Sequence, residues 1–227
     1  MGISPDLRGV KLLAPSILSA DFARLGEEVD LVLDMGVRLV RIDVMDGHFV
    51  PNLTVGPAVV AALAPRVHER GAFLDVHLMI EEPDRFLADF ADAGADALSV
   101  HVETCPNLHR TLTAIRDLGL SAGLALNPAT DIVVVGEALN FCDYVLAMSV
   151  NPGFGGQRFI PDSLFKLRRL RAMMPGGVAL EVDGGVGRDN IFALAAAGAN
   201  WIVAGSAVFG TGDTAEEITV LTELLNQ

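Results

Sequence analysis

The chain has 227 residues, of which 51% are hydrophobic and 20% charged, and its formal net charge is −13. This length and apolar content predict one domain, spanning residues 1–227, with a large hydrophobic core and without the run of about 18 uncharged apolar residues that a membrane span requires. The negative charge, which no cluster of lysines and arginines offsets, excludes nucleic acid as a partner.

The N-terminal segment, residues 1–11, carries no recognisable targeting signal. It lacks both the apolar core of a signal peptide and the arginine- and serine-rich composition of a transit peptide, so we expect a cytoplasmic protein. Cys105 and Cys142 are the only cysteines, and their spacing predicts neither a disulfide framework nor a zinc knuckle.

A strand–loop–helix pattern repeats along the rest of the chain. Each unit has a short β-branched or aliphatic run, then a loop with glycine or proline, then an amphipathic stretch. The predicted strands are residues 12–17, 39–44, 72–78, 97–102, 121–126, 144–148, 178–182 and 201–204. Helices alternate with them, and the clearest are residues 21–35, 83–93, 108–118 and 162–173.

Eight strands alternating with eight helices predict a fold of the α/β class, with a parallel sheet and right-handed crossovers. Closure of such a sheet gives a (β/α)8 TIM barrel. An open doubly wound sheet is the alternative, and it usually has a GxGxxG turn after the first strand. Here the first strand contains Ala14 and Pro15 and runs into Ser16, so we predict the barrel.

A polar residue or glycine stands at the C-terminal end of every predicted strand, where barrel enzymes carry their chemistry. Any one of them taken alone could be a helix cap or a turn residue. Asp43 and Asp183 are the most informative, because one carboxylate could remove a proton from carbon while the other returns a proton to the opposite face. The whole set is Ser16, Asp43, His77, His101, Asn127, Ser149, Asp183 and Gly205 with Ser206.

Glycine-bearing loops follow the last three strands, at residues 151–157, 184–187 and 204–207. Glycines let backbone N–H groups approach an anion closely, and barrels often hold phosphate after strands seven and eight. Three tight turns without a ligand are the alternative. The predicted binding residues are Gly153, Phe154, Gly155, Gly156, Gly184, Gly185, Gly205 and Ser206.

Three of the residues at the strand ends, Asp43, His77 and Asp183, could bind one divalent cation. Carboxylate and imidazole ligands suit zinc, iron, manganese or cobalt. Such a cation would acidify a proton on carbon next to a carbonyl and stabilise the resulting enediolate. A structural role is the alternative for His77, and His101 is a candidate hydrogen-bond partner behind the site. No lysine lies at a strand end, which argues against a Schiff-base aldolase and leaves a metal-dependent aldolase or decarboxylase as an alternative.

Seven segments of the chain match one protein family in order. They are APSILSADFARLGEE (14–28), IDVMDGHFVPNLTVGP (42–57), DVHLMI (75–80), LNPAT (126–130), MSVNPGFGGQRFIP (148–161), LEVDGGV (180–186) and VAGSAVF (203–209). Through these segments the chain resembles the ribulose-5-phosphate 3-epimerase family along nearly its whole length. The resemblance implies an isomerase that interconverts D-ribulose 5-phosphate and D-xylulose 5-phosphate in the pentose phosphate pathway, and a homo-oligomer.

The resemblance also implies roles for individual residues. Asp43 and Asp183 would be both the acid/base pair and metal ligands, and His77 would be a third ligand close to the substrate. Ser16 would contact the substrate, and the glycine loops would bind its phosphate. The loop after the sixth strand would cover the site. An apolar surface around the reacting carbons would come from Met45, Met79 and Met148.

One position departs from the family pattern. The family usually has a histidine two residues before the first catalytic aspartate, as a fourth metal ligand, and this chain has Arg41. Arginine does not bind metals, and its side chain would share the inward-facing side of the strand with Asp43.

Three alternatives follow from Arg41. The metal could be held by three protein ligands. The charge of Arg41 could replace the metal and stabilise the enediolate directly. Or the site could be altered, either for another ketose phosphate such as allulose 6-phosphate or into a metal-poor paralogue that binds a sugar phosphate without converting it.

Overall fold

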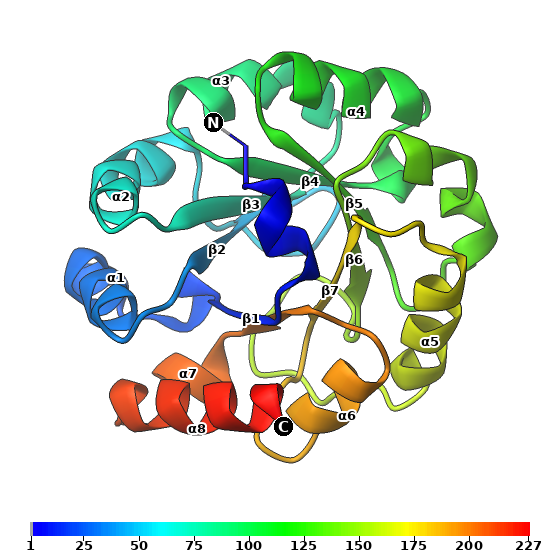
Figure 1. Cartoon of the computed structure of the whole chain (residues 1–227). Helices are drawn as coiled ribbons and strands as arrows, with labels where there is room; N and C mark the ends of the chain where they lie inside the picture. The colour runs from blue at the N-terminus through cyan, green and yellow to red at the C-terminus, as the bar shows by residue number, and fades with distance from the viewer. Residues whose placement is uncertain (1) are drawn as a thin grey trace.

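A computed structural model describes residues 2–227 and confirms the predicted (β/α)8 barrel (Figure 1). Its parallel strands form one sheet in the order β1-β8-β7-β6-β5-β4-β3-β2, and a bridge between Ser16 and Arg41 brings β1 to β2, so that the ring is nearly closed. The strands are β1 (Leu12–Pro15), β2 (Leu39–Met45), β3 (Phe73–Met79), β4 (Ala97–His101), β5 (Ser121–Leu126), β6 (Tyr144–Met148), β7 (Ala179–Asp183) and β8 (Trp201–Ala204).

The helices surround the ring of strands in Figure 1. The α-helices are α1 (Leu25–Asp34), α2 (Pro57–Glu69), α3 (Leu87–Asp92), α4 (Leu108–Asp117), α5 (Ser163–Met173), α6 (Ile191–Ala196), α7 (Ser206–Phe209) and α8 (Thr214–Asn226). Short 3₁₀-helices occupy the connections: η1 (Pro5–Gly9), η2 (Ile17–Ser19), η3 (Phe22–Arg24), η4 (Pro83–Arg85), η5 (Val102–Thr104), η6 (Ile132–Val135) and η7 (Glu137–Asn140).

The predicted strict alternation of strands and helices is wrong in one unit. The connection from β5 to β6 contains η6 and η7 in place of an α-helix, while β8 is followed by both α7 and α8. The run of β-branched residues at 133–135 and the following Gly136 disfavour a continuous α-helix in the β5–β6 connection.

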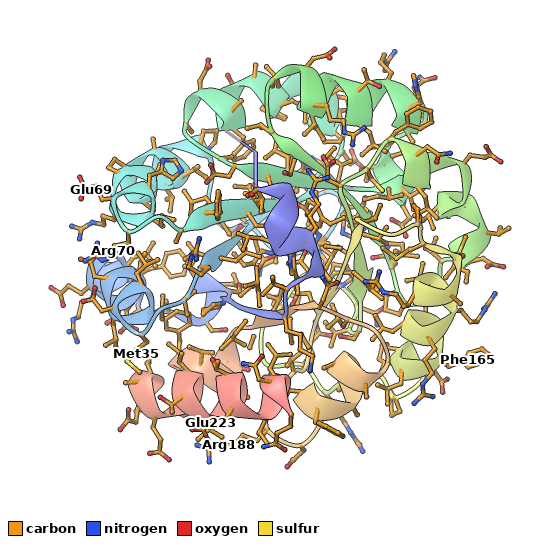
Figure 2. The ribbon with its side chains drawn as sticks, viewed as in Figure 1. Met35, Glu69, Arg70, Phe165, Arg188 and Glu223 are labelled. Atoms are coloured by element: carbon orange, nitrogen blue, oxygen red, sulfur yellow. The ribbon has the colours of Figure 1, made fainter. Side chains whose placement is uncertain are left out.

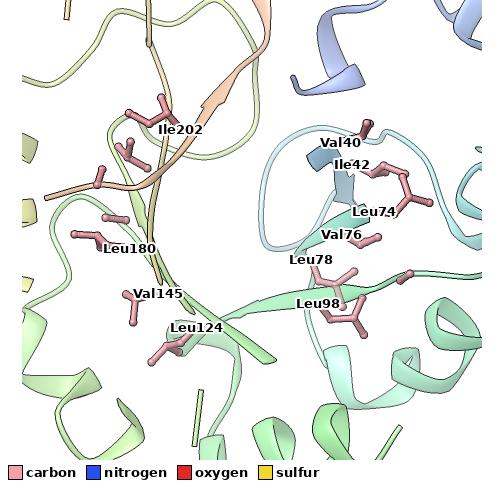
Figure 3. Packing of buried hydrophobic residues seen from close by; sticks show 14 of the residues in the cluster. Val40, Ile42, Leu74, Val76, Leu78, Leu98, Leu124, Val145, Leu180 and Ile202 are labelled. Carbon is pink, nitrogen blue, oxygen red and sulfur yellow. The ribbon is translucent and has the colours of Figure 1, made fainter. Parts of the chain in front are cut away.

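The hydrophobic core lies between the strands and the surrounding helices. Successive side chains of a strand point to opposite faces, so every second residue points outward to the helices. Val40 and Ile42 of β2 and Val76 of β3 belong to this layer, part of which Figure 3 shows. Each of these side chains is fully buried, which stabilises the fold by roughly 1.5–3 kcal/mol per residue.

The inward-facing residues form layers inside the barrel. The register of β2 and β3 places Arg41 opposite Asp75, and Asp43 opposite His77. Below them, Tyr144 and Trp201 belong to an apolar cluster at the N-terminal end of the barrel. The N-terminal segment lies across this end of the ring in Figure 1, and the carbonyl oxygen of its Leu7 accepts a hydrogen bond from Trp201 Nε1 at 3.1 Å.

Charged side chains cover the outer faces of the helices, as Glu69, Arg70 and Glu223 do in Figure 2. None of the helices in residues 2–227 has the length and apolar composition needed to cross a bilayer. The two cysteines are both buried and free, in agreement with the predicted absence of a disulfide.

Candidate active site

A cavity opens at the C-terminal end of the barrel strands. Its empty volume is about 540 Å³, which includes space open to solvent. Four of the residues predicted at the strand ends lie outside its lining: His77, which contacts Asp43 from behind, and His101, Asn127 and Ser149. The other predicted site residues line it together: Ser16, Asp43, Met45, Met79, Met148, Gly153, Phe154, Gly155, Gly156, Asp183, Gly184, Gly185, Gly205 and Ser206.

The two aspartates come from strands on different sides of the barrel. Asp43 lies near the end of β2, and Asp183 is the last residue of β7. The Ser16 hydroxyl donates a hydrogen bond to Asp43 Oδ2 at 2.5 Å, and His77 Nδ1 lies 3.0 Å from Asp43 Oδ1. One oxygen of each carboxylate and one His77 nitrogen all lie within 4.8 Å of one another. The carboxylates are therefore close enough to act on one small molecule.

The surroundings of the two aspartates separate their pKa values. Burial raises the pKa of Asp183 to about 8, and the negative charge of Asp43 adds to this. Burial opposes ionisation of Asp43 as well, but the contact with His77 and the charge of Arg41 outweigh it and lower the pKa of Asp43. Burial lowers the pKa of His77 to about 3, so its imidazole is neutral. Without a cation, the pair holds one proton at neutral pH, on Asp183.

The donor set of Asp43, His77 and Asp183 fits a divalent cation. Two carboxylates and one neutral imidazole are ligands that zinc, iron, manganese and cobalt accept. Asp43 and His77 are also buried, and charges interact strongly away from water. A cation held by the three side chains would offset the repulsion between the carboxylates of Asp43 and Asp183.

Arg41 extends away from the cavity into the layer beneath it. Its Nε lies 3.0 Å from Asp75 Oδ2, and its Nη2 lies 2.6 Å from Glu181 Oε2. Its Nη1 lies 3.9 Å from Asp43 Oδ1. Arg41 is absent from the cavity lining, so its guanidinium is not positioned against a bound substrate. This geometry argues against the alternative in which Arg41 contacts the enediolate.

Arg41 belongs to a buried network that the sequence analysis did not identify. Burial raises the pKa values of Asp75 and Glu181, and the charge of Arg41 opposes both shifts. The Tyr144 hydroxyl donates a hydrogen bond to Asp75 Oδ1 at 2.5 Å. Gly123 makes room for the Tyr144 ring, since a Cβ at this glycine would lie 2.2 Å from Tyr144 Cζ. The network therefore compensates the charge of Arg41 below the aspartates.

The sequence did contain a signal for this network. Asp75 and Glu181 precede His77 and Asp183 by two residues, as Arg41 precedes Asp43. Residues two apart in a strand point the same way, so this spacing places all three in one inward-facing layer.

The glycine loops meet at the same end of the barrel. Gly185 has a φ of +63°, and a Cβ there would lie 2.4 Å from the backbone nitrogen of Phe159 in the loop after β6. A Cβ at Gly205 would lie 2.8 Å from Ser19 Oγ, so the loops after β1 and β8 are also close. Ser19 and Gln157 line the cavity too, although the sequence analysis did not single them out.

The loop after β6 contacts the loop after β2. Asn52 Nδ2 donates a hydrogen bond to the Gly153 carbonyl oxygen at 2.7 Å. Phe154 of the same loop lines the cavity and is 55% exposed, so it lies at the rim.

Comparison with known sequences identifies close relatives. The sequence model of the ribulose-phosphate 3 epimerase family matches residues 12–209. A ribulose-phosphate 3-epimerase from Synechocystis sp. is 53% identical over 212 residues, which cover 91% of each chain. One from Bacillus subtilis is 50% identical over 211 residues, covering 91% of this chain and 96% of the relative.

Solved structures share the fold at low sequence identity. A 3-keto-L-gulonate-6-phosphate decarboxylase from Vibrio cholerae aligns with a TM-score of 0.71 and 14% identity, covering 96% of this chain and 98% of that one. A 3-hexulose-6-phosphate synthase aligns with a TM-score of 0.70 and 20% identity, covering 95% of this chain and 100% of that one. These similarities establish the fold alone.

Proposed function

Because the chain belongs to the ribulose-phosphate 3-epimerase family, whose members are carbohydrate epimerases, we propose that it interconverts D-ribulose 5-phosphate and D-xylulose 5-phosphate. The observation that carries the proposal is the pair formed by Asp43 and Asp183, whose carboxylate oxygens approach within 4.8 Å of each other and which both line the cavity.

The reaction would be a two-base proton transfer at C3 of the ketose phosphate. Asp43, the carboxylate with the lowered pKa, takes the C3 proton, and the ketose becomes an enediolate. Asp183, whose pKa is raised to about 8, returns a proton to the opposite face of C3. The roles exchange in the reverse direction. Ser16 orients the Asp43 carboxylate through their hydrogen bond.

Asp43, His77 and Asp183 would hold a divalent metal ion, which is zinc, iron, manganese or cobalt on the chemistry of these ligands. When bound, such an ion makes the C3 proton more acidic and stabilises negative charge on the enediolate oxygens. Arg41 supplies no ligand, so the protein would contribute three ligands and leave positions open for the substrate.

The rest of the cavity would position the sugar phosphate. Backbone N–H groups of the loops after β6, β7 and β8 would bind the phosphate, which suits a chain with only two lysines. The apolar side chains of Met45, Met79 and Met148 line the cavity near the aspartates and would exclude water from the reacting carbons.

The test is epimerisation of ribulose 5-phosphate together with exchange of its C3 hydrogen with solvent. Asp43→Asn and Asp183→Asn should each lose formation of xylulose 5-phosphate by about 10²–10⁴-fold, because each removes one of the two proton-transfer groups. In deuterated water, Asp43→Asn should also lose deuterium incorporation into ribulose 5-phosphate, whereas Asp183→Asn keeps the base that removes this proton. Asp117→Asn, which removes an exposed carboxylate from the end of α4, is the control and should convert and exchange normally. Full conversion by either active-site variant would refute the two-base scheme.

The same assay separates the remaining alternatives. A higher kcat/KM for allulose 6-phosphate than for ribulose 5-phosphate would assign another ketose phosphate as the substrate. Binding of ribulose 5-phosphate without exchange by the wild-type chain would indicate a non-catalytic paralogue. A cytoplasmic homo-oligomer is also part of the proposal, and light scattering of the purified protein tests the assembly.

A further inference from the structure

A hydrogen-bonded chain leads from the candidate metal site to the protein surface. His77 Nε2 lies 2.8 Å from His101 Nε2, and His101 Nδ1 lies 3.1 Å from Glu103 Oε2. Both imidazoles are fully buried, with ring centroids 5.0 Å apart and ring planes inclined by 28°, so the two rings meet edge to edge. The side chain of Glu103 is 23% exposed. The chain Asp43–His77–His101–Glu103 thus has a carboxylate at each end.

The second oxygen of Glu103 is held by the loop after β5. Its Oε1 accepts a hydrogen bond from the Asn127 N–H at 2.8 Å and another from the Thr130 hydroxyl. The Lys166 ammonium donates to the carbonyl oxygens of Asn127 and Thr130 at 2.6 and 2.7 Å, which fixes this loop against α5. Burial opposes ionisation of Glu103, but the hydrogen bonds from His101, Thr130 and Asn127 lower its pKa to about 2.

The hydrogen-bonded chain from Asp43 to Glu103 has fewer N–H protons than it has contacts between side chains. When both rings are neutral, each carries one N–H and one lone pair, so His77 and His101 together supply two protons. Three contacts need to be satisfied: Asp43 to His77, His77 to His101, and His101 to Glu103. One of the three contacts therefore lacks a proton and joins two acceptor atoms. A metal ion can bridge those two atoms only where further ligands are available. Asp183 joins Asp43 and His77 at that end.

We propose that Glu103, acting through His101, is a positioning residue that directs the Nδ1 lone pair of His77 toward the metal site. As a carboxylate, Glu103 accepts the N–H of His101 Nδ1. His101 then has its lone pair at Nε2 and accepts the N–H of His77 Nε2. His77 is left with its lone pair at Nδ1, 3.0 Å from Asp43 Oδ1, where the proposed metal ion would bind. This inference rests on the metal site of the proposed function.

The substitution Glu103→Gln tests the donor–acceptor order of these hydrogen bonds, because glutamine has almost the same shape as glutamate. The amide oxygen should stay at the Oε1 position, because Asn127 N–H and the Thr130 hydroxyl donate there. The amide N–H then faces His101 Nδ1 and favours the opposite order, which ends with an N–H on His77 Nδ1. A protonated nitrogen cannot bind a metal. Zinc binding to this variant therefore requires the protons of His101 and His77 to move back to the original order, which lowers the zinc affinity.

Zinc titration of the EDTA-treated protein against a chromophoric chelator measures the effect. Glu103→Gln should weaken zinc binding by about 10–100-fold, as loss of an outer hydrogen-bond partner of a metal-binding histidine does. Glu81→Gln is the matched control, because Glu81 and Glu103 line one surface hollow and the substitution removes the same charge. The control should bind zinc within twofold of the wild-type chain.

Nitrogen-15 NMR of the histidine rings provides a second test that needs no variant. In the zinc-loaded wild-type chain, His101 should carry its proton on Nδ1 and none on Nε2. A proton on His101 Nε2, or unchanged zinc affinity in Glu103→Gln, would overturn the inference and leave the metal site standing. Absence of zinc binding by the wild-type chain would overturn both, while the C3 exchange assay would still judge the epimerase reaction separately.

Discussion

Arg41 places a permanent positive charge under Asp43 and Asp183, the proposed acid/base pair. Its Nη1 lies 3.9 Å from Asp43 Oδ1, while Asp75 and Glu181 contact the rest of the guanidinium. The contacts with Asp75 and Glu181 have ion-pair distances of 3.0 and 2.6 Å. Arg41 therefore acts on the site through its charge.

Arg41→His should strengthen zinc binding and weaken the fold. Removing the charge 3.9 Å from Asp43 and adding an imidazole should raise zinc affinity about tenfold, which corresponds to about 1.4 kcal/mol. Asp75 and Glu181 would lose their buried partner, and breaking such a pair costs about 3–5 kcal/mol of unfolding free energy. Zinc titration and urea denaturation check the two effects. Arg188→His on the outer surface is the control, and unchanged zinc affinity in Arg41→His would show that the network already neutralises the charge.

At the residue scale, the sequence predicted which side chains meet but not which ones support them. The aspartates, the methionines and the glycines were identified because each ends a strand or belongs to a matching segment. Glu103 and Glu181 were missed although their partners, His101 and Arg41, had been identified, because which side chains pair inside the barrel depends on its register. The spacing of two residues in His101-Val102-Glu103 was the available signal.

The elements themselves followed from local patterns. Most strands begin and end within one residue of their predicted bounds, because side-chain alternation and the glycines that end the helices mark them. The first strand stops at Pro15, two residues early, since Ser16 caps the 3₁₀-helix η2 by accepting a hydrogen bond from the Leu18 N–H. The conformation of the β5–β6 connection could not be predicted. The spacing of its apolar residues favours a helix, whereas the β-branched side chains among them disfavour one.

The loop after β7 allows a matched test of the phosphate site. Gly185→Ala should raise KM for the sugar phosphate at least tenfold, because the new Cβ would lie 2.4 Å from the Phe159 nitrogen at a φ of +63° and would displace both loops. Gly187→Ala, in the same loop, meets nothing within 4 Å and should change KM less than twofold. Steady-state kinetics and phosphate inhibition measure both. Equal KM values for the two variants would contradict a phosphate site in this loop.

For the molecule as a whole, the raised pKa of Asp183 links stability to pH. The group holds its proton in the folded chain up to about pH 8 but loses it near pH 4 when unfolded, so unfolding releases a proton in this window. Its stabilising contribution is complete below about pH 4 and is lost as the pH rises to about 8, by at most about 1.4 kcal/mol per pH unit.

Urea denaturation of the EDTA-treated chain at several pH values checks this linkage. The wild-type protein should lose more unfolding free energy between pH 5 and pH 8 than Asp183→Asn, which has no proton to release at this position. Asp75 and Glu181 also have raised pKa values, but they are present in both proteins and cancel in the comparison. Equal losses of unfolding free energy in the two proteins would rule out a raised pKa of Asp183.

The closed end of the barrel has a spectroscopic consequence. The only tryptophan and the only tyrosine of the chain, Trp201 and Tyr144, are fully buried there with ring centroids 5.2 Å apart. Neither lines the cavity that contains the aspartates. Intrinsic fluorescence and near-ultraviolet dichroism therefore originate mainly at the floor of the barrel, so they report the loss of native packing there and are insensitive to a sugar entering at the opposite mouth.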